Sequence, residues 1–73
     1  MYTEKIRILE DEIFQIKKAI KASKKEIKNR EKILSMVEDE EVEVEIEMYK
    51  EEIEKFTNES KTRKELIKNY KKL

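Results

Sequence analysis

The sequence predicts an all-α protein, an antiparallel helical hairpin of the coiled-coil type that dimerises into a four-helix bundle. Three observations predict this fold. Apolar residues recur at a seven-residue spacing along most of the chain. The chain has no glycine, proline or cysteine and is 49% charged, a composition typical of long solvated helices. The only break in the helical pattern lies near the middle of the 73 residues, so a single domain spanning residues 1–73 is expected.

The first predicted helix covers about residues 3–37. Its apolar residues fall at the a and d positions of five heptads, and eight of these ten positions are aliphatic. The a positions are Ile6, Ile13, Ile20, Ile27 and Leu34, and the d positions are Leu9, Ile16, Ser23, Arg30 and Val37. We call this stripe, together with its counterpart on the second helix, the seam.

The stretch EDEEVEVEIEMY, residues 38–49, alternates acidic and apolar residues, which is the period of a strand. A strand is excluded because no other segment could pair with it. A continuous helix would place the acidic residues Glu41 and Glu51 in the seam. The apolar pattern instead resumes at Val42, and this shift relative to the first heptad pattern matches neither a stutter nor a stammer. The sequence therefore predicts a turn at about residues 38–41, with Asp39 as the N-cap of the next helix.

The second predicted helix covers about residues 42–72. Its seam comprises Val42, Ile46, Tyr49, Ile53, Phe56, Ser60, Arg63, Ile67 and Tyr70. Ser60 and Arg63 interrupt this seam as Ser23 and Arg30 interrupt the first. The two arginines either set the register of the helices or, more commonly at such positions, extend their charged heads into solvent.

Charge patterning supports the antiparallel arrangement. Residues 17–32 sum to +6 and residues 33–54 to −9, within a chain of zero net charge. Folding back at the turn sets Lys25, Lys28 and Lys32 near acidic residues of the second helix, whereas a parallel arrangement would oppose like charges. Because exposed ion pairs contribute only about 0–1 kcal/mol each, they select the orientation more than they stabilise the fold.

A second apolar set lies off the seam and predicts a further contact surface. A two-helix hairpin buries little, so covering these residues in a dimer of hairpins would add stability. Scattered apolar residues on an ordinary surface are the alternative interpretation. The predicted partner or dimer surface comprises Ile8, Phe14, Ile33, Met36, Val44, Met48 and Leu66, with Leu73 at the C-terminus.

The sequence offers few groups for catalysis. It has no histidine and no cysteine, the usual bases, nucleophiles and transition-metal ligands. The acidic run at Glu38–Glu47 lacks the spacing and the glycine of a calcium-binding loop, and no phosphate-binding glycine loop occurs. No apolar run is long enough to cross a membrane. We therefore expect a cytoplasmic protein that is not an enzyme and has no catalytic residue, no metal site, no cofactor and no membrane partner.

The segment SKTRKELIKNY, Ser60–Tyr70, is similar in spacing to the S-Q-x-L-D-x-L-I-x-x-Y segment of the small helical-hairpin aspartyl-phosphate phosphatases of sporulation phosphorelays. The matching residues are Ser60, Leu66, Ile67 and Tyr70. Lys61, Arg63 and Lys64 replace the residues that define the motif, including the acidic residue on which the family's activity depends. The resemblance covers 11 of the 73 residues and implies no phosphatase function for this chain.

Two classes of function remain. The first is a protein–protein interaction module, a small regulator, inhibitor or assembly factor that binds another protein. In one variant of it, the acidic turn occupies a basic, nucleic-acid-binding surface of the target. The second is nucleic-acid binding through a lysine-rich face, which comprises Lys17, Lys18, Lys21, Lys24, Lys25 and Lys28. Zero net charge and the lack of an aromatic stacking platform make nucleic acid the less favoured partner.

Overall fold

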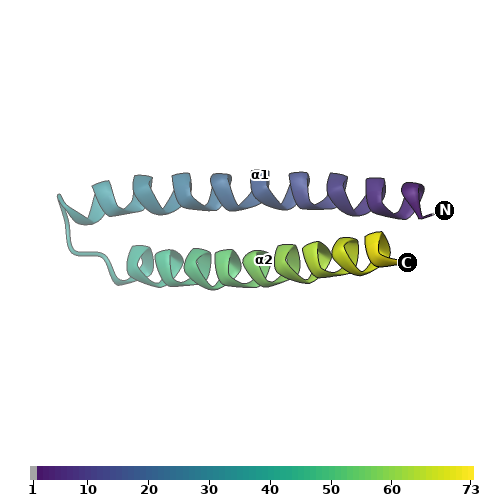
Figure 1. Ribbon diagram of the computed structural model, residues 1–73. Helices are drawn as coiled ribbons and strands as arrows, with labels where there is room; N and C mark the ends of the chain where they lie inside the picture. Colours follow the sequence, from purple (N-terminus) through teal and green to yellow (C-terminus); the bar gives the residue numbers. More distant parts are fainter. Residues whose placement is uncertain (1) are drawn as a thin grey trace.

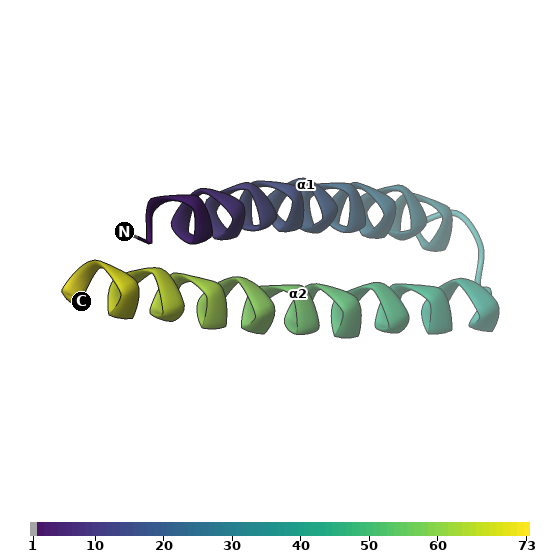
Figure 2. The same cartoon turned by 90° about the vertical axis from the view of Figure 1, so that its right-hand side faces the viewer.

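The computed structural model, which describes residues 2–73, contains two long helices packed side by side. Helix α1 spans Thr3–Leu34 and helix α2 spans Glu40–Lys72. They run antiparallel, so that both termini lie at one end and the connection lies at the other (Figures 1 and 2). The hairpin measures 56 × 14 × 12 Å. The predicted all-α helical hairpin is confirmed, and residues 2–73 contain no strand.

Helix α1 ends three residues before the predicted position. The Ser35 hydroxyl donates to the carbonyl oxygen of Lys32 at 2.6 Å, and the Met36 N–H donates to Ile33, only three residues back. These bonds tighten the last turn and compete with further α-helix. Leu34 is therefore the last seam residue of α1, because α2 has no residue level with position 37. The placement of Val37 in the seam is wrong: Val37 lies in the connection and is 54% exposed.

The connection comprises residues 35–39, and its last residue, Asp39, is the N-cap of α2. Asp39 adopts an extended backbone, and its carboxylate accepts hydrogen bonds from the N–H groups of Glu41 and Val42. Glu40, Glu41 and Glu43 occupy the first turn, where the helix dipole favours negative charge. The reversal thus falls a few residues earlier than the predicted turn, while the predicted N-cap, Asp39, is the residue observed.

Contacts between the helices fix their register. Arg30 faces Glu45, Ser23 faces Glu52 and Arg63 faces Glu12, and in each pair the two residue numbers add to the same value. At the open end, the rings of Tyr2 and Tyr70 lie 5.1 Å apart. The helices therefore stay level with each other from the connection to the termini.

The core between the helices is thin. Five apolar residues are buried, and no described side chain is fully enclosed. The buried residues are Ile13 and Ile16 on α1 and Val42, Ile46 and Ile67 on α2. Because each helix has only one neighbour, most of its circumference remains in solvent.

Candidate interaction surface

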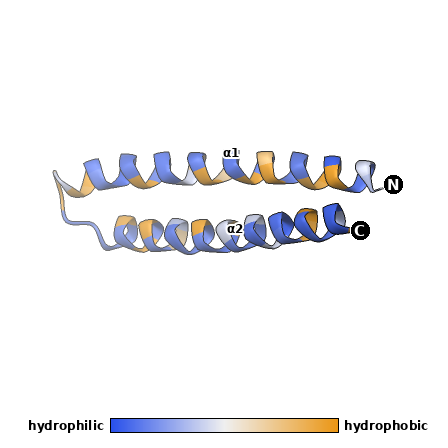
Figure 3. Ribbon diagram, in the orientation of Figure 1, coloured by the Kyte–Doolittle hydropathy of each residue, from blue (hydrophilic) through white to orange (hydrophobic). Residues whose placement is uncertain are grey.

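The seam residues line the contact between α1 and α2. Besides the five buried residues, nine predicted seam residues are half-buried: Ile6, Leu9, Ile20, Ile27, Leu34, Tyr49, Ile53, Phe56 and Tyr70. Ser23 and Ser60 are also buried, and the Ser23 hydroxyl lies 3.5 Å from a carboxylate oxygen of Glu52, at the outer limit of a hydrogen bond. In Figure 3, hydrophilic residues cover most of the helices, and hydrophobic ones follow the sides turned toward each other.

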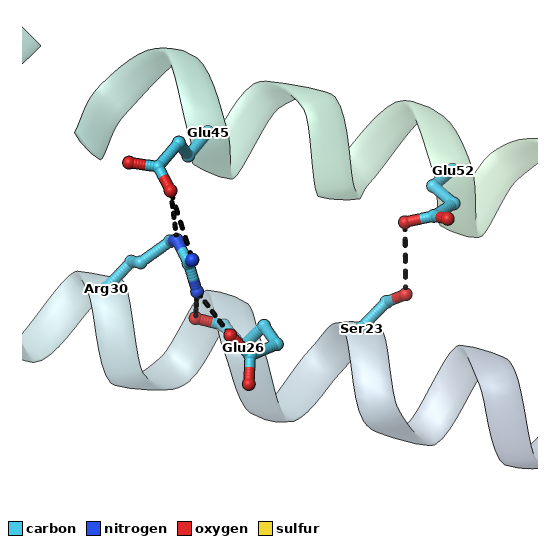
Figure 4. Close-up of polar contacts among 5 residues, drawn as sticks. All are labelled: Ser23, Glu26, Arg30, Glu45 and Glu52. Atoms are coloured by element: carbon cyan, nitrogen blue, oxygen red, sulfur yellow. Dashed lines mark hydrogen bonds and ion pairs between the residues drawn. The ribbon is translucent and has the colours of Figure 1, made fainter. Parts of the chain in front are cut away.

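Arg30 binds carboxylates of both helices (Figure 4). Its Nε and Nη2 atoms each lie 3.0 Å from Oε2 of Glu45 on α2. Its Nη1 donates to the carboxylate of Glu26 and to the carbonyl oxygen of the same residue. The guanidinium also lies 4.8 Å from the ring centroid of Tyr49. The bond to Glu26 is the main cause that raises the pKa of Arg30 above its ordinary value, with Glu45 adding to it.

Arg63 occupies the corresponding place on α2 but is less completely bound. Its Nε lies 3.6 Å from a carboxylate oxygen of Glu12 on α1, and its Nη1 donates to the carbonyl oxygen of Glu59 at 3.2 Å. The buried Nε has no hydrogen-bond partner among residues 2–73. Both arginine heads are thus largely covered and directed at the opposite helix, whereas the sequence favoured heads that reach solvent.

Sequence reasoning missed the glutamates that bind these arginines, although a signal for them exists. Residues 9–34 and 42–67, aligned at an offset of 33, are identical at eight of 26 positions. The identical positions include both arginines and the pairs Glu12/Glu45 and Glu26/Glu59. The hairpin therefore has an approximate internal two-fold symmetry, which relates the Arg30–Glu45 contact to the Arg63–Glu12 contact.

The hairpin has two broad faces, one on each side of the plane that contains the helix axes. At 100° per residue, the g and c positions of each heptad point to one face, and the e and b positions point to the other. Within residues 7–33 of α1 and 43–69 of α2, residues of the g/c face are Ile8, Glu12, Gln15, Ala19, Ala22, Glu26, Asn29, Ile33, Glu45, Met48, Glu52, Lys55, Glu59, Thr62, Leu66 and Asn69. Lys5 and Glu41 continue this face toward the helix ends. In the same two ranges, residues of the e/b face are Arg7, Glu10, Phe14, Lys17, Lys21, Lys24, Lys28, Glu31, Glu43, Glu47, Lys50, Glu54, Thr57, Lys61, Lys64 and Lys68. Thr3, Glu40 and Lys71 continue this face toward the helix ends.

The two faces differ sharply in charge. On the e/b face, 14 of the 16 residues are charged and only Phe14 is apolar. On the g/c face, six of the 16 are charged and six are apolar. Four of the five glutamates among these 16 residues of the g/c face are held by seam residues, two by Arg30, one by Arg63 and one by Ser23. The g/c face is therefore the less charged side of the hairpin, and most of its glutamates already have a hydrogen-bond or ion-pair partner.

Half of the residues of the predicted partner or dimer surface belong to the g/c face. Ile8, Ile33, Met48 and Leu66 lie there, and all four are exposed. The other four predicted residues are also exposed but lie elsewhere: Phe14 on the e/b face, Val44 on the outer edge of α2, Met36 in the connection, and Leu73 after the end of α2. The predicted set is therefore not one patch, and four of its members form the apolar part of one face.

The six lysines of the predicted nucleic-acid face are all exposed on α1. Four belong to the e/b face, and Lys18 and Lys25 lie on the outer edge of the helix. The Nζ atom of Lys18 lies 4.7 Å from the ring centroid of Phe14. Within residues 2–73 none of the six takes part in an ion pair; the contacts between the helices are instead made by the two arginines.

Among the described residues, no group of three or more carboxylates is arranged to hold a metal ion. Neither helix has a stretch that is both long and apolar enough to cross a membrane. No protein-family model matches the chain, and no curated protein or solved structure is significantly similar to it.

Proposed function

We propose that this chain is a non-enzymatic protein–protein interaction module. In this proposal two hairpins associate into a four-helix bundle of the coiled-coil type, and the assembly acts as a small regulator, inhibitor or assembly factor by binding another protein. Helix bundles bury a third heptad position besides a and d, usually e or g, and the g/c face supplies that position here.

The observation that carries the proposal is the amount of surface that one hairpin leaves in solvent. Its accessible area is 6141 Å². A compact monomer of 8.9 kDa would expose about 4,800 Å². The difference, about 1,300 Å², exceeds the roughly 800 Å² that each partner buries in a standard interface. The radius of gyration is 16.7 Å, whereas a compact chain of this length would have about 11 Å, so the hairpin is also more extended than a compact monomer.

The g/c face is the side on which this surface can be removed from water at least cost. Burying the e/b face would desolvate 14 charged side chains, most without a partner. On the g/c face the Arg30 and Arg63 contacts already bind several of the glutamates, so fewer free charges would lose water. The apolar side chains of this face then contribute the hydrophobic gain.

Light scattering at tens of micromolar tests the association. We expect the mass of a dimer or a larger assembly, and a melting temperature that rises with protein concentration because association stabilises the folded state. A monomer of full helicity, with a melting temperature independent of concentration, would contradict the proposal. A pull-down from the native host, compared between the wild type and Met48→Glu, then tests whether a protein partner binds and whether its binding requires the assembled bundle.

Nucleic-acid binding is the second candidate, and the six exposed lysines without an ion-pair partner favour it. The acidic residues of α2 and the neutral total oppose it. We expect at most weak, sequence-independent binding that disappears near physiological salt, because phosphate contacts alone depend steeply on salt. Fluorescence anisotropy with duplex DNA and single-stranded RNA measures it. Sub-micromolar, sequence-selective binding at that salt would make nucleic acid the principal partner.

A further inference from the structure

We propose that the second hairpin stacks on the g/c face in the reversed orientation, with the two connections at opposite ends of the four-helix bundle. This inference rests on the proposed dimer and specifies how its two copies meet. Helix α1 would lie on α1 of the second copy, and α2 on α2. The alternative stack keeps both connections at the same end and places α1 on α2 of the second copy.

The positions of the apolar residues along α1 indicate the reversed stack. Ile8 and Ile33 lie near opposite ends of the helix, and Ala19 and Ala22 lie between them. Both pairs are centred on the same point, between residues 20 and 21. A two-fold axis through this point sets Ile8 against Ile33 of the second copy and Ala19 against Ala22. Small residues at the centre allow the two helices to approach closely.

Helix α2 gives the same result independently. Met48 and Leu66 are centred on residue 57, so the reversed stack sets each against the other residue of the second copy. In the register fixed by the Arg30–Glu45 pair, this centre lies about 4 Å along the axis from the centre on α1, less than one helical turn. One two-fold axis can therefore serve both helices.

The polar residues of the g/c face fit the same axis. Opposite each of the five glutamates within residues 7–33 and 43–69, the reversed stack places an amide, a hydroxyl or a lysine, so none of them faces another glutamate. Glu41, at the end of the face, lies level with Leu73 of the second copy. The resulting pairs across the interface are Glu12 with Asn29, Gln15 with Glu26, Glu45 with Asn69, Glu52 with Thr62, and Lys55 with Glu59. Each pair occurs twice because of the two-fold symmetry.

The alternative stack loses most of these matches. With both connections at one end, Ile33 would lie level with Glu41 of the second copy, and Met48 level with Glu26. The two central alanines, Ala19 and Ala22, would face Lys55 and Glu52. Only the contact between Ile8 and Leu66 would remain apolar. Apolar surface would therefore be buried against charged groups along most of the interface.

A distance between spin labels at the two connections tests the orientation. The chain has no cysteine, so Glu38→Cys introduces a single labelling site in the exposed connection. Residue 38 lies about 25 Å from the centre of the stack, so the reversed orientation predicts roughly 50 Å between the labels of two chains. The alternative predicts about 10 Å, the spacing of packed helices.

A second label serves as the matched control. Thr57→Cys lies at the centre of α2 on the e/b face and gives a distance below about 30 Å in either orientation, so it reports the dimer itself. A long distance at residue 38 with a short one at residue 57 supports the inference. Short distances at both sites overturn the reversed orientation and leave the proposed dimer standing. No distance at either site, with a monomer mass in solution, overturns the dimer and the inference together.

Discussion

Arg30 and Arg63 occupy the same heptad position 33 residues apart, and each faces a glutamate of the opposite helix, yet their surroundings differ. Arg30 donates to two carboxylates, and its guanidinium lies over the ring of Tyr49. Arg63 has one carboxylate at 3.6 Å and a buried Nε without a partner. We refer to these two contacts, with the seam residues beside them, as the Arg30 layer and the Arg63 layer.

The residue that differs between the layers explains the contrast. At the internal offset of 33, the counterpart of Tyr49 is Ile16, whose aliphatic side chain offers no π face to Arg63. A guanidinium held on one side by an aromatic ring presents its N–H groups to the carboxylates in a fixed direction. Each layer contains one arginine and two glutamates. Near the connection the arginine binds both carboxylates, whereas toward the termini it contacts only one of them.

Truncating the buried isoleucine of each layer gives the largest expected effect. Ile46 follows Glu45 in the Arg30 layer, and Ile13 follows Glu12 in the Arg63 layer; the two are about equally buried. Ile46→Ala and Ile13→Ala should each lower the free energy of unfolding by about 2–5 kcal/mol. We expect the greater loss for Ile46→Ala, because the bound Arg30 limits the collapse of the cavity. Urea unfolding followed by circular dichroism measures both, and a greater loss for Ile13→Ala would reverse the comparison.

Replacing the arginines tests the layers directly. Arg30→Met leaves the carboxylates of Glu26 and Glu45 without their cation, so the melting temperature should fall. Arg63→Met removes an unsatisfied buried Nε and a long ion pair, so the free energy of unfolding should stay within about 1 kcal/mol of the wild type or rise. Thermal unfolding of both variants at one protein concentration gives the answer. If Arg63→Met proved the more destabilising, the two layers would have been ranked wrongly.

The N-cap gives a smaller effect at the same end of the hairpin as the Arg30 layer. Asp39→Ala removes the acceptor for the N–H groups of Glu41 and Val42 and should cost about 1 kcal/mol. Asp39→Asn keeps an acceptor oxygen and serves as the control, with a cost well below that of alanine. Equal losses in the two variants would show that the cap contributes little to α2.

Lengthening the connection should have the smallest effect. Two glycines inserted between Val37 and Glu38 leave the Asp39 cap and the seam register unchanged. Because loop closure depends only weakly on length, the loss should be below about 0.6 kcal/mol. A loss of several kcal/mol would show that the connection itself positions the Arg30 layer.

The hairpin could be predicted from the sequence because its determinants are local. The heptad spacing, the break at residues 38–41 and the capping aspartate each depend on neighbouring residues. The end of α1 could not be predicted in this way because it depends on where α2 begins. Helix α2 starts at Glu40, so no residue of α2 lies level with Val37 and could pack against it. The arginine layers were missed because a guanidinium at a d position can turn either to solvent or across the seam. Only the facing residues, such as Tyr49 and Glu45, decide between these directions.

The arginines of the two layers bind glutamates of the g/c face and so reduce the number of free charges on the surface through which the hairpins are proposed to associate. The most direct test compares two substitutions on α2. Met48 belongs to the g/c face and Val44 to the outer edge of the same helix, and they are 63% and 59% exposed, so neither contributes much to the hairpin itself. Light scattering of Met48→Glu and Val44→Glu at tens of micromolar should give a monomer for the first and an assembly with the wild-type mass for the second. If Met48→Glu kept the wild-type assembly while Val44→Glu lost it, the g/c face would not be the surface on which the hairpins meet.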